Sequence, residues 1–209
     1  MKVYKLSCRF SVMLSLCLLS GMSVQSNAAA APAEQTAVFA GGCFWGVDAV
    51  FKHVKGVSSV ESGYSGGERA TANYERVSRG DTGHAESVRI RFKPAVISYG
   101  KLMELFFYVA HDPTQFNRQG PDFGSQYRSV IFYTGPEQQK QAADYIRLLT
   151  HAHTFSSPIV TQVVPLKQFY PAEAYHQNYL ALHPNDPYII INDMTKLQQL
   201  RKKYPALYK

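Results

Sequence analysis

Cysteine is scarce in this sequence, and its three copies lie early. Cys8 and Cys17 fall in the first segment, and no cysteine follows Cys43 in a chain of 209 residues. A set of internal disulfides, or a zinc site built from paired cysteines, is therefore excluded for the chain beyond residue 43. Internal repeats and long low-complexity runs are also absent, which favours one compact domain with its own core.

An apolar run long enough to anchor the chain in a bilayer is missing as well. The first segment begins with three cations (Lys2, Lys5 and Arg9), continues with an apolar run over residues 10–19, and then has small residues over 28–31. This order is typical of a secretory signal peptide, because about ten apolar residues are too few to span a bilayer.

The sequence therefore predicts a signal peptide over residues 1–31 and a mature domain over residues 32–209, without a membrane span, in the periplasm or outside the cell. An amphipathic N-terminal helix is the alternative, but no polar stripe interrupts the apolar run. A lipoprotein start at Cys17 is set aside, because Leu16 stands where a small residue would be required. Removal of the leader would leave Cys43 as the single thiol.

The chain also lacks a strong net charge. The net charge of +7 falls to +4 when the three cations of the first segment are removed. The remaining basic residues are scattered, apart from a cluster over 201–203. Such a modest charge favours solubility over nucleic-acid binding, so we expect no nucleic-acid partner.

Hydrophobic periodicity predicts strands alternating with helices. Thr134 and Glu137 have the spacing of a capping box at the start of one helix. The alternation favours an α+β fold, a two-layer α/β sandwich with a ferredoxin-like mixed sheet and helices packed on it. Predicted strands cover residues 33–40, 56–67, 87–92, 128–133 and 159–166, and predicted helices cover 44–55, 99–111, 134–150, 171–182 and 194–203.

Cys43 lies where the first predicted strand meets the first predicted helix. Unpaired N–H groups and the helix dipole favour an anion there, which predicts a lowered thiol pKa. Gly41 and Gly42 let the backbone turn tightly and leave the sulfur approachable. A buried inert cysteine is the alternative. Phe44 and Trp45 add apolar surface beside the thiol, although core packing would explain either one alone.

Two further segments carry candidate polar groups. A Gly/Asp/Thr/Gly turn over residues 80–83 leads to Glu86 at the mouth of a predicted strand, where a partly desolvated carboxyl would keep its proton near neutral pH. An ordinary surface glutamate is the alternative. The polar loop over residues 111–128 is either a solvated connection or a place where a site is built.

Five motifs, in this order, resemble those of the A-class peptide methionine sulfoxide reductases. The similarity covers residues 38–187, and five ordered motifs are far more specific than one signature. The motifs are Gly42-Cys43-Phe44-Trp45-Gly46, Gly63-Tyr64-Ser65-Gly66-Gly67, Gly80-Asp81-Thr82-Gly83-His84-Ala85-Glu86, the stretch from His111-Asp112-Pro113 to Gln126-Tyr127-Arg128-Ser129, and Phe169-Tyr170-Pro171-Ala172-Glu173 with His176-Gln177.

The resemblance implies a role for each polar candidate. Cys43 would be the nucleophile that takes the oxygen, and Glu86 the acid that protonates it. Tyr74 and Tyr127 would donate hydrogen bonds to that oxygen, and Asp122 would order the polar side of the pocket. The implied substrate is the S epimer of methionine sulfoxide, free or in oxidised proteins.

The resemblance also implies how the methyl group is held and how the enzyme is regenerated. Phe44 and Trp45 would contact the substrate methyl group. Many relatives carry further cysteines near the C-terminus, and this chain has none. A sulfenic acid on Cys43 would therefore be reduced by an external thiol, either a thioredoxin-like protein or a small thiol, with no bound cofactor.

Three other functions stay open at this point. A cysteine hydrolase would use His84 or His111 as the base for Cys43. A metal site would use His151 with His153, or His84 with Glu86, although such pairs share a face only in a strand. A non-catalytic periplasmic binding module would bind its ligand without needing the thiol.

Overall fold

The computed structural model describes Met1 and residues 33–209, so the predicted signal peptide lies outside the described residues. None of the helices within residues 33–209 is long and apolar enough to cross a membrane. In chain order the elements are β1 (Gln35–Ala40), α1 (Phe44–Lys52), β2 (Val57–Ser65), η1 (Arg69–Thr71), α2 (Tyr74–Val77), β3 (Ala85–Phe92), α3 (Tyr99–Leu105), η2 (Phe106–Ala110), β4 (Arg118–Gln119), β5 (Asp122–Phe123), η3 (Ser125–Tyr127), β6 (Val130–Tyr133), α4 (Pro136–His151), β7 (Gln162–Pro165), β8 (Phe169–Pro171), η4 (Ala174–His176), α5 (Tyr179–Leu182), η5 (Ile189–Asp193) and α6 (Met194–Lys203).

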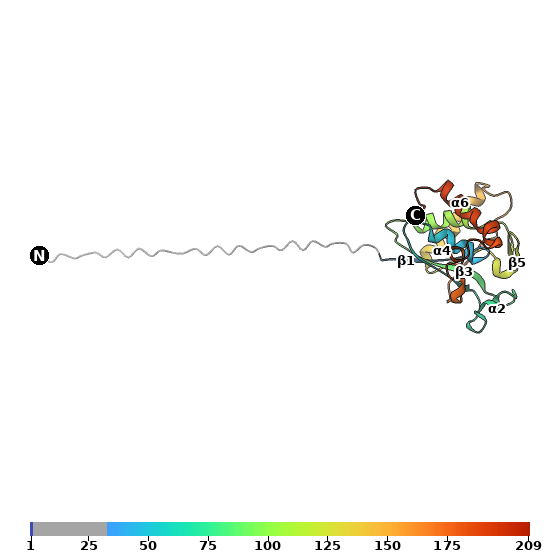
Figure 1. Cartoon of the computed structure of the whole chain (residues 1–209). Coiled ribbons are helices and arrows are strands. Elements are labelled where there is room, and N and C mark those ends of the chain that lie inside the picture. The colour runs from blue at the N-terminus through green and yellow to red at the C-terminus, as the bar shows by residue number, and fades with distance from the viewer. Residues whose placement is uncertain (2–32) are drawn as a thin grey trace. The chain divides into compact units, whose positions relative to one another are not determined.

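The main sheet has six strands in the order β7-β6-β1-β3-β2-β8. Its four central strands, β6, β1, β3 and β2, pair antiparallel with one another, and the elements β1-α1-β2-β3-α3-β6 follow the ferredoxin-like order, which confirms the predicted fold class. Only β7 runs parallel to its neighbour, β6, among the described strands. In the view of Figure 1, α4 and α6 lie above β3 and α2 lies below it.

The sheet is strongly curled. β7 and β8 are its two edge strands, yet only residues 166–168 separate Pro165 from Phe169. Five strand spacings across a flat sheet would measure about 24 Å. Four residue steps reach at most about 14 Å, so the two edges must approach each other at this end.

Apolar side chains fill both faces of the sheet, but unequally. The helix-covered face holds the main core, in which the rings of Phe39 and Phe106 stack at 4.8 Å between centroids. The other face has a smaller cluster, formed by Val38, Ala40, Ala85, Val130, Phe132 and Phe169. Because successive residues of a strand point to opposite faces, β1 supplies Phe39 to one cluster and Val38 and Ala40 to the other.

One predicted helix and one predicted helix cap were wrong. Residues 171–182 do not form one helix: Pro171 belongs to β8, and Asn178 takes a left-handed conformation with φ of 55° between η4 and α5. The Gln177 side chain binds the N–H and carbonyl groups of Ser62 on β2, so tertiary hydrogen bonds override the helical spacing. The helix over 134–150 is present as α4, but its capping box does not form, because the N-cap is Gly135 and glycine has no side-chain acceptor.

Candidate active site

The turn between β1 and α1 brings the thiol against a distant loop. Gly42 has a φ of +91°, and its N–H donates to the Tyr127 carbonyl at 3.2 Å. A Cβ on Gly42 would lie 2.5 Å from Cγ of Gln119, and one on Gly41 would lie 2.8 Å from Cγ of His111. The turn packs directly on the loop that follows η2. Both positions therefore require glycine, because a side chain at either one would collide with this loop.

Cys43 and Glu86 are held at the same turn of α1. Cys43 is the N-cap residue, so its sulfur lies at the helix N-terminus with 8 % of the residue exposed. Glu86 is the second residue of β3 and is 2 % exposed, and its Oε2 accepts a hydrogen bond from the Phe44 N–H at 3.1 Å. The carboxyl is thus fixed beside the first helical amide, one residue beyond the thiol.

Burial decides the protonation of both groups. It raises the pKa of Glu86 to about 8, an effect opposed by the Phe44 N–H and increased by the Asp122 charge. Burial also raises the pKa of Cys43 well above its ordinary value, and the charges of Glu86 and Asp193 act in the same direction. The expectation of a lowered thiol pKa was wrong. The hydrogen bond from the Trp45 N–H at the helix end lowers the pKa of Cys43, but burial raises it by more. In the free site at neutral pH, the thiol and the carboxyl both keep their protons.

A buried ion pair lies over the same helical turn. Lys196 Nζ contacts Asp193 Oδ1 at 2.9 Å, and Asp193 is fully buried. A Cβ on Gly46 would collide with the Asp193 carboxyl and lie 2.6 Å from Lys196 Nζ. Gly46 therefore gives α6 access to the first turn of α1, where the charge of Lys196 lowers the pKa of Cys43 and that of Asp193 raises it.

Tyr74 reaches the pocket from the start of α2. The Asn73 side chain caps this helix by accepting from the Arg76 N–H, and the Tyr74 N–H donates to Glu173 Oε1 at 2.9 Å. Burial raises the pKa of Tyr74, and the Glu86 charge adds to the rise, so its hydroxyl is a hydrogen-bond donor at neutral pH.

Tyr127 and Asp122 belong to the polar loop, which is more ordered than the sequence indicated. Residues 118–123 form the β4–β5 hairpin, and Tyr127 ends η3. The Arg128 guanidinium donates to the carbonyls of Gly83 and His84, which joins η3 to the segment leading into β3. This loop is therefore part of a site wall, and the interpretation as a solvated connection is wrong.

The aromatic side of the site is built around Trp45. The indole stacks on Tyr179 with 3.7 Å between ring centroids and a 6° angle between planes. Phe44 is 1 % exposed, and its ring packs 5.8 Å from that of Tyr64. Flat apolar surface is thus presented in the cavity that also holds the thiol.

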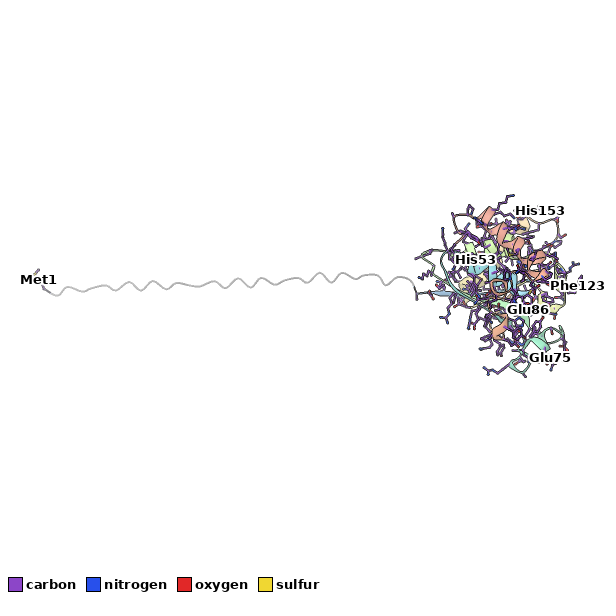
Figure 2. The ribbon with its side chains drawn as sticks, in the orientation of Figure 1. Met1, His53, Glu75, Glu86, Phe123 and His153 are labelled. Carbon is purple, nitrogen blue, oxygen red and sulfur yellow. The ribbon has the colours of Figure 1, made fainter. Side chains whose placement is uncertain are left out.

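These groups enclose one cavity of about 210 Å³. Glu86 is buried and Phe123, the neighbour of Asp122, is exposed; in the view of Figure 2 the first lies within the outline of the fold and the second at its edge. All seven residues proposed from the sequence line this cavity, and Tyr188 completes it. The lining residues are Cys43, Phe44, Trp45, Tyr74, Glu86, Asp122, Tyr127 and Tyr188.

Tyr188 is the lining residue that sequence reasoning missed. Its hydroxyl donates to the Asp122 carboxylate across 66 residues of chain. The similarity to the family motifs ended at residue 187, one position earlier, and the following Ile-Ile-Ile run gives no sign of a site. Only the tertiary contact with Asp122 identifies it.

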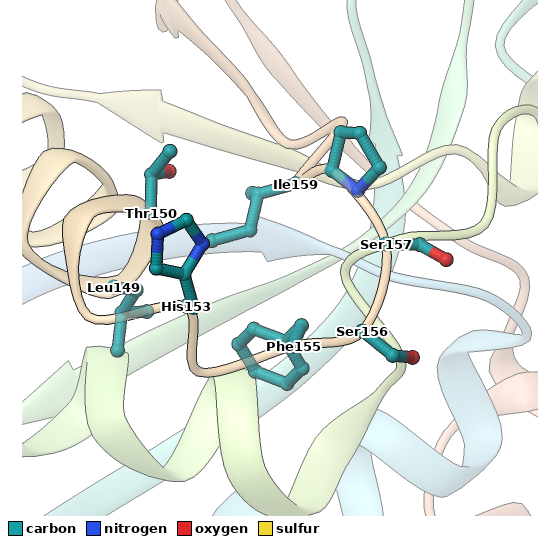
Figure 3. Close-up of a pocket in the computed structure, with 8 residues that line it drawn as sticks. Leu149, Thr150, His153, Phe155, Ser156, Ser157 and Ile159 are labelled. Atoms are coloured by element: carbon teal, nitrogen blue, oxygen red, sulfur yellow. The ribbon is translucent and has the colours of Figure 1, made fainter.

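The histidines give no support to the hydrolase or metal alternatives. No histidine within residues 33–209 lines the cavity. Both ring nitrogens of His111 are bonded, to the Phe106 carbonyl and to Ser129 Oγ, and both of His84 are bonded to backbone groups. His153 lies at a different cavity, of about 260 Å³, at the end of α4 (Figure 3), and the described residues hold no group of three or more metal-ligating side chains.

The fold and the site together define a class of protein. A buried thiol at a helix start and a carboxyl that keeps its proton line one cavity, and phenols and a carboxylate line the rest of it. Without a histidine base at the thiol, this arrangement suits a cysteine enzyme that attacks a polarised group and protonates the departing atom.

Comparison with known proteins names the family. The sequence model described as "Peptide methionine sulfoxide reductase" matches residues 35–207. The chain is 54 % identical to "Peptide methionine sulfoxide reductase MsrA 2" of Mesorhizobium japonicum over 179 residues, covering 86 % of this chain and 92 % of the relative. It is 53 % identical to the Synechocystis sp. protein of the same name over 170 residues, covering 81 % and 79 %.

Solved structures agree. Reduced Mxr1 from Saccharomyces cerevisiae is similar with a TM-score of 0.69 and 34 % identity, covering 73 % of this chain and 87 % of that one. Methionine sulfoxide reductase A of Corynebacterium diphtheriae has a TM-score of 0.65 and 33 % identity, covering 73 % and 76 %. The chain belongs to the peptide methionine sulfoxide reductase family, in its A class, and is an oxidoreductase that reduces methionine sulfoxide with thiol as the source of electrons.

Proposed function

We propose that Cys43 takes the oxygen of methionine S-sulfoxide while Glu86 supplies the proton that this oxygen needs in order to leave sulfur. The single observation that carries the proposal is the position of Glu86. It is buried and hydrogen-bonded to the Phe44 N–H, with a pKa of about 8, beside the only thiol of the cavity. A carboxyl in that state is an acid at neutral pH.

Oxygen transfer from the substrate to Cys43 takes two steps. Cys43 sulfur bonds to the substrate sulfur and loses its proton to solvent, while Glu86 protonates the sulfoxide oxygen. The hydroxyl then moves to Cys43, which becomes a sulfenic acid, and the substrate leaves as the thioether. Glu86 regains a proton from solvent. Methionine sulfur is reduced by two electrons, and Cys43 is oxidised by two.

Acid catalysis has to supply most of the acceleration. Lowering a thiol pKa by about two units raises the thiolate fraction near neutral pH by roughly 25-fold, while nucleophilicity falls by about eightfold. The net gain would be only about threefold, and in this site burial moves the pKa of Cys43 the other way. General acid catalysis typically contributes a factor of about 10² to 10⁴.

The other wall would orient the substrate. Tyr74 and Tyr127 are placed to donate to the sulfoxide oxygen, and Asp122 orders this side through its bond with Tyr188. Phe44 and Trp45 would take the methyl group. Because oxygen, methyl group and side chain would each occupy a separate part of the cavity, the S epimer is accepted and the R epimer is rejected.

The sulfenic acid would be removed by an external reductant. No thiol follows Cys43 in the chain, so no internal disulfide can form beyond it. One thiol attacks the sulfenic sulfur and releases water, and a second thiol then releases Cys43 as the external disulfide forms. We assign this role to a thioredoxin-like protein or a small thiol.

The order of residues 1–31 supports a location outside the cytoplasm for this activity. With residues 1–31 removed as a signal peptide, the mature domain over residues 32–209 would repair oxidised periplasmic or secreted proteins. The mass of the protein purified from its natural host tests this directly, since export predicts cleavage within residues 28–33. An intact N-terminus on a cytoplasmic protein would refute the location.

The activity is tested with separated sulfoxide epimers and no reductant. We expect about one equivalent of methionine per site from the S epimer, none from the R epimer, and one added oxygen in the intact mass, trapped on Cys43 by a sulfenic-acid reagent. Added thiol should restart turnover. Equal rates on both epimers, or continued turnover without thiol, would contradict the proposal.

A further inference from the structure

The side chain of Trp45 is held from behind by a group that does not line the cavity. Its Nε1–H donates a hydrogen bond to Nδ1 of His176 at 3.1 Å. Tyr179 stacks on the indole face, and the ring of Tyr188 meets it at 85°. Stacking restricts the tilt of the indole, and the hydrogen bond fixes its rotation in its own plane.

The hydrogen bond determines the protonation of His176. An indole N–H is only a donor, so Nδ1 must present its lone pair, and the proton of a neutral imidazole is then on Nε2. A cationic ring would set two donors against each other. His176 is 1 % exposed, and within residues 33–209 its Nε2 has no hydrogen-bond partner, with Glu173 Oε2 the nearest carboxylate at 4.0 Å.

The same imidazole also supports two other walls of the site. Its ring centroid lies 4.9 Å from that of Phe44 and 4.5 Å from that of Tyr74. Glu173, three residues earlier on the same turn, accepts the Tyr74 N–H and the Tyr64 hydroxyl. The turn that contains η4 therefore backs both the apolar and the polar side of the cavity.

We propose that His176 is a positioning residue for sulfoxide reduction: as the neutral imidazole with its proton on Nε2, it fixes the Trp45 indole in the orientation that receives the substrate methyl group. This inference rests on the methyl-binding role given to Trp45 in the proposed function. It assigns no contact with substrate to His176, which acts through the indole.

Two substitutions separate the hydrogen bond from ring packing. His176→Phe keeps a flat ring but removes the acceptor, which leaves a partly buried indole N–H unpaired. His176→Asn loses the ring but places a side-chain oxygen near the position of Nδ1, where it accepts the same bond. We expect kcat/KM for the S sulfoxide to fall by about tenfold to a hundredfold in the Phe variant, mainly through KM, and by much less in the Asn variant.

The indole itself gives a readout that does not depend on activity. Trp45 is the only tryptophan of the chain, so its Nε1–H gives a single indole signal in a nitrogen–proton NMR spectrum. We expect slow solvent exchange and a hydrogen-bonded proton shift in the wild type and in His176→Asn. Faster exchange and a shift toward free indole are expected in His176→Phe.

The opposite ranking would overturn the inference. If His176→Phe matches the wild type in kinetics and in the indole signal, or if His176→Asn is as impaired as His176→Phe, packing and not the hydrogen bond is what counts. Should the variants fail to fold, the imidazole nitrogen shifts of the wild type decide, and a proton on Nδ1 at pH 7 would refute the assigned tautomer. Failure of the proposed function would appear separately, as a wild type without sulfoxide reduction but with the indole bond intact.

Discussion

The two walls of the cavity are built in different ways. Cys43 and Glu86 stand on the central part of the fold, Cys43 at the junction of β1 with α1 and Glu86 on β3. The strands β1 and β3 pair with each other over Gln35–Phe39 and Val88–Phe92. Tyr74, Asp122 and Tyr127 stand on short elements of two to four residues. The long ladders of the main sheet position the first pair, whereas a two-residue hairpin ladder and side-chain hydrogen bonds position the second group.

This difference means that the reacting atoms are held by the more rigid part of the fold. We call the part of the cavity that carries Cys43 and Glu86 the sheet wall. The thiol and the acid must approach one small group within a few tenths of an ångström, and the ladders that β3 makes with β1 and β2 give that precision. The wall formed by Tyr74, Asp122 and Tyr127, here called the loop wall, has to accept a substrate. It is held by hydrogen bonds with Glu173, Arg128 and Tyr188. Substitutions on the sheet wall should therefore abolish chemistry, and those on the loop wall should tune it.

Cys43→Ser is the strongest test of the sheet wall. Serine nearly matches cysteine in volume, but its hydroxyl is a poor nucleophile toward sulfur, so sulfoxide reduction should be lost. The thermal midpoint should change little, because a small polar side chain at a helix N-cap is well tolerated. Turnover of the S sulfoxide with excess thiol measures the loss, and more than a trace of activity would defeat the role of Cys43.

Glu86→Gln should slow oxygen transfer by at least about a hundredfold, because the amide keeps the shape but delivers no acid proton. In the wild type the acid form of Glu86 is present below its pKa of about 8, so the rate should fall as pH rises through that value. The variant should lack this alkaline limb. Single-turnover rates across pH give both results, and a variant within threefold of the wild type would require another acid.

On the loop wall, Tyr74→Phe and Tyr127→Phe should each cost about 1–3 kcal/mol, which corresponds to a fall of about 5- to 150-fold in kcat/KM. Each change removes one donor to the sulfoxide oxygen and keeps the ring. Tyr133→Phe serves as a matched control, since Tyr133 lies at the end of β6 away from the lining residues. A control as impaired as either variant would show a general packing effect.

The central fold could be predicted because its signals are local. The alternation of Val88, Ile90 and Phe92 and the helical spacing after Phe44 place β3 and α1 within a few residues of their bounds. The segment 171–182 could not be predicted, since the hydrogen bonds of Gln177 with β2 and the left-handed Asn178 depend on tertiary contacts.

The site divides in the same way. Motif similarity brought together seven lining residues, but it gave no sign of Tyr188 and included His176 without a role, because both act through partners distant in sequence. The thiol pKa shows the limit most clearly. The helix end next to Cys43 is visible in the sequence and predicts a lowered pKa. The burial that reverses the sign comes from the folded chain as a whole.

Asp122→Asn should have the smallest effect on the rate. It tests whether the charge of Asp122 on the loop wall acts on Glu86 on the sheet wall. The Asn oxygen can still accept the Tyr188 hydroxyl, so the loop wall should keep its geometry. The Asp122 charge raises the pKa of Glu86, however, and its removal makes the Glu86 carboxylate easier to form. The acid form is then lost at lower pH, so the alkaline limb should move down by less than about one pH unit with little change in the maximal rate. Single-turnover rates between pH 6 and 9 measure the shift. A limb that stays in place would mean that the two carboxyls do not interact, and a limb that moves up would contradict the sign of the coupling. If the maximal rate instead collapsed, Asp122 would take part in the chemistry itself, and the division between a reacting wall and an orienting wall would fail.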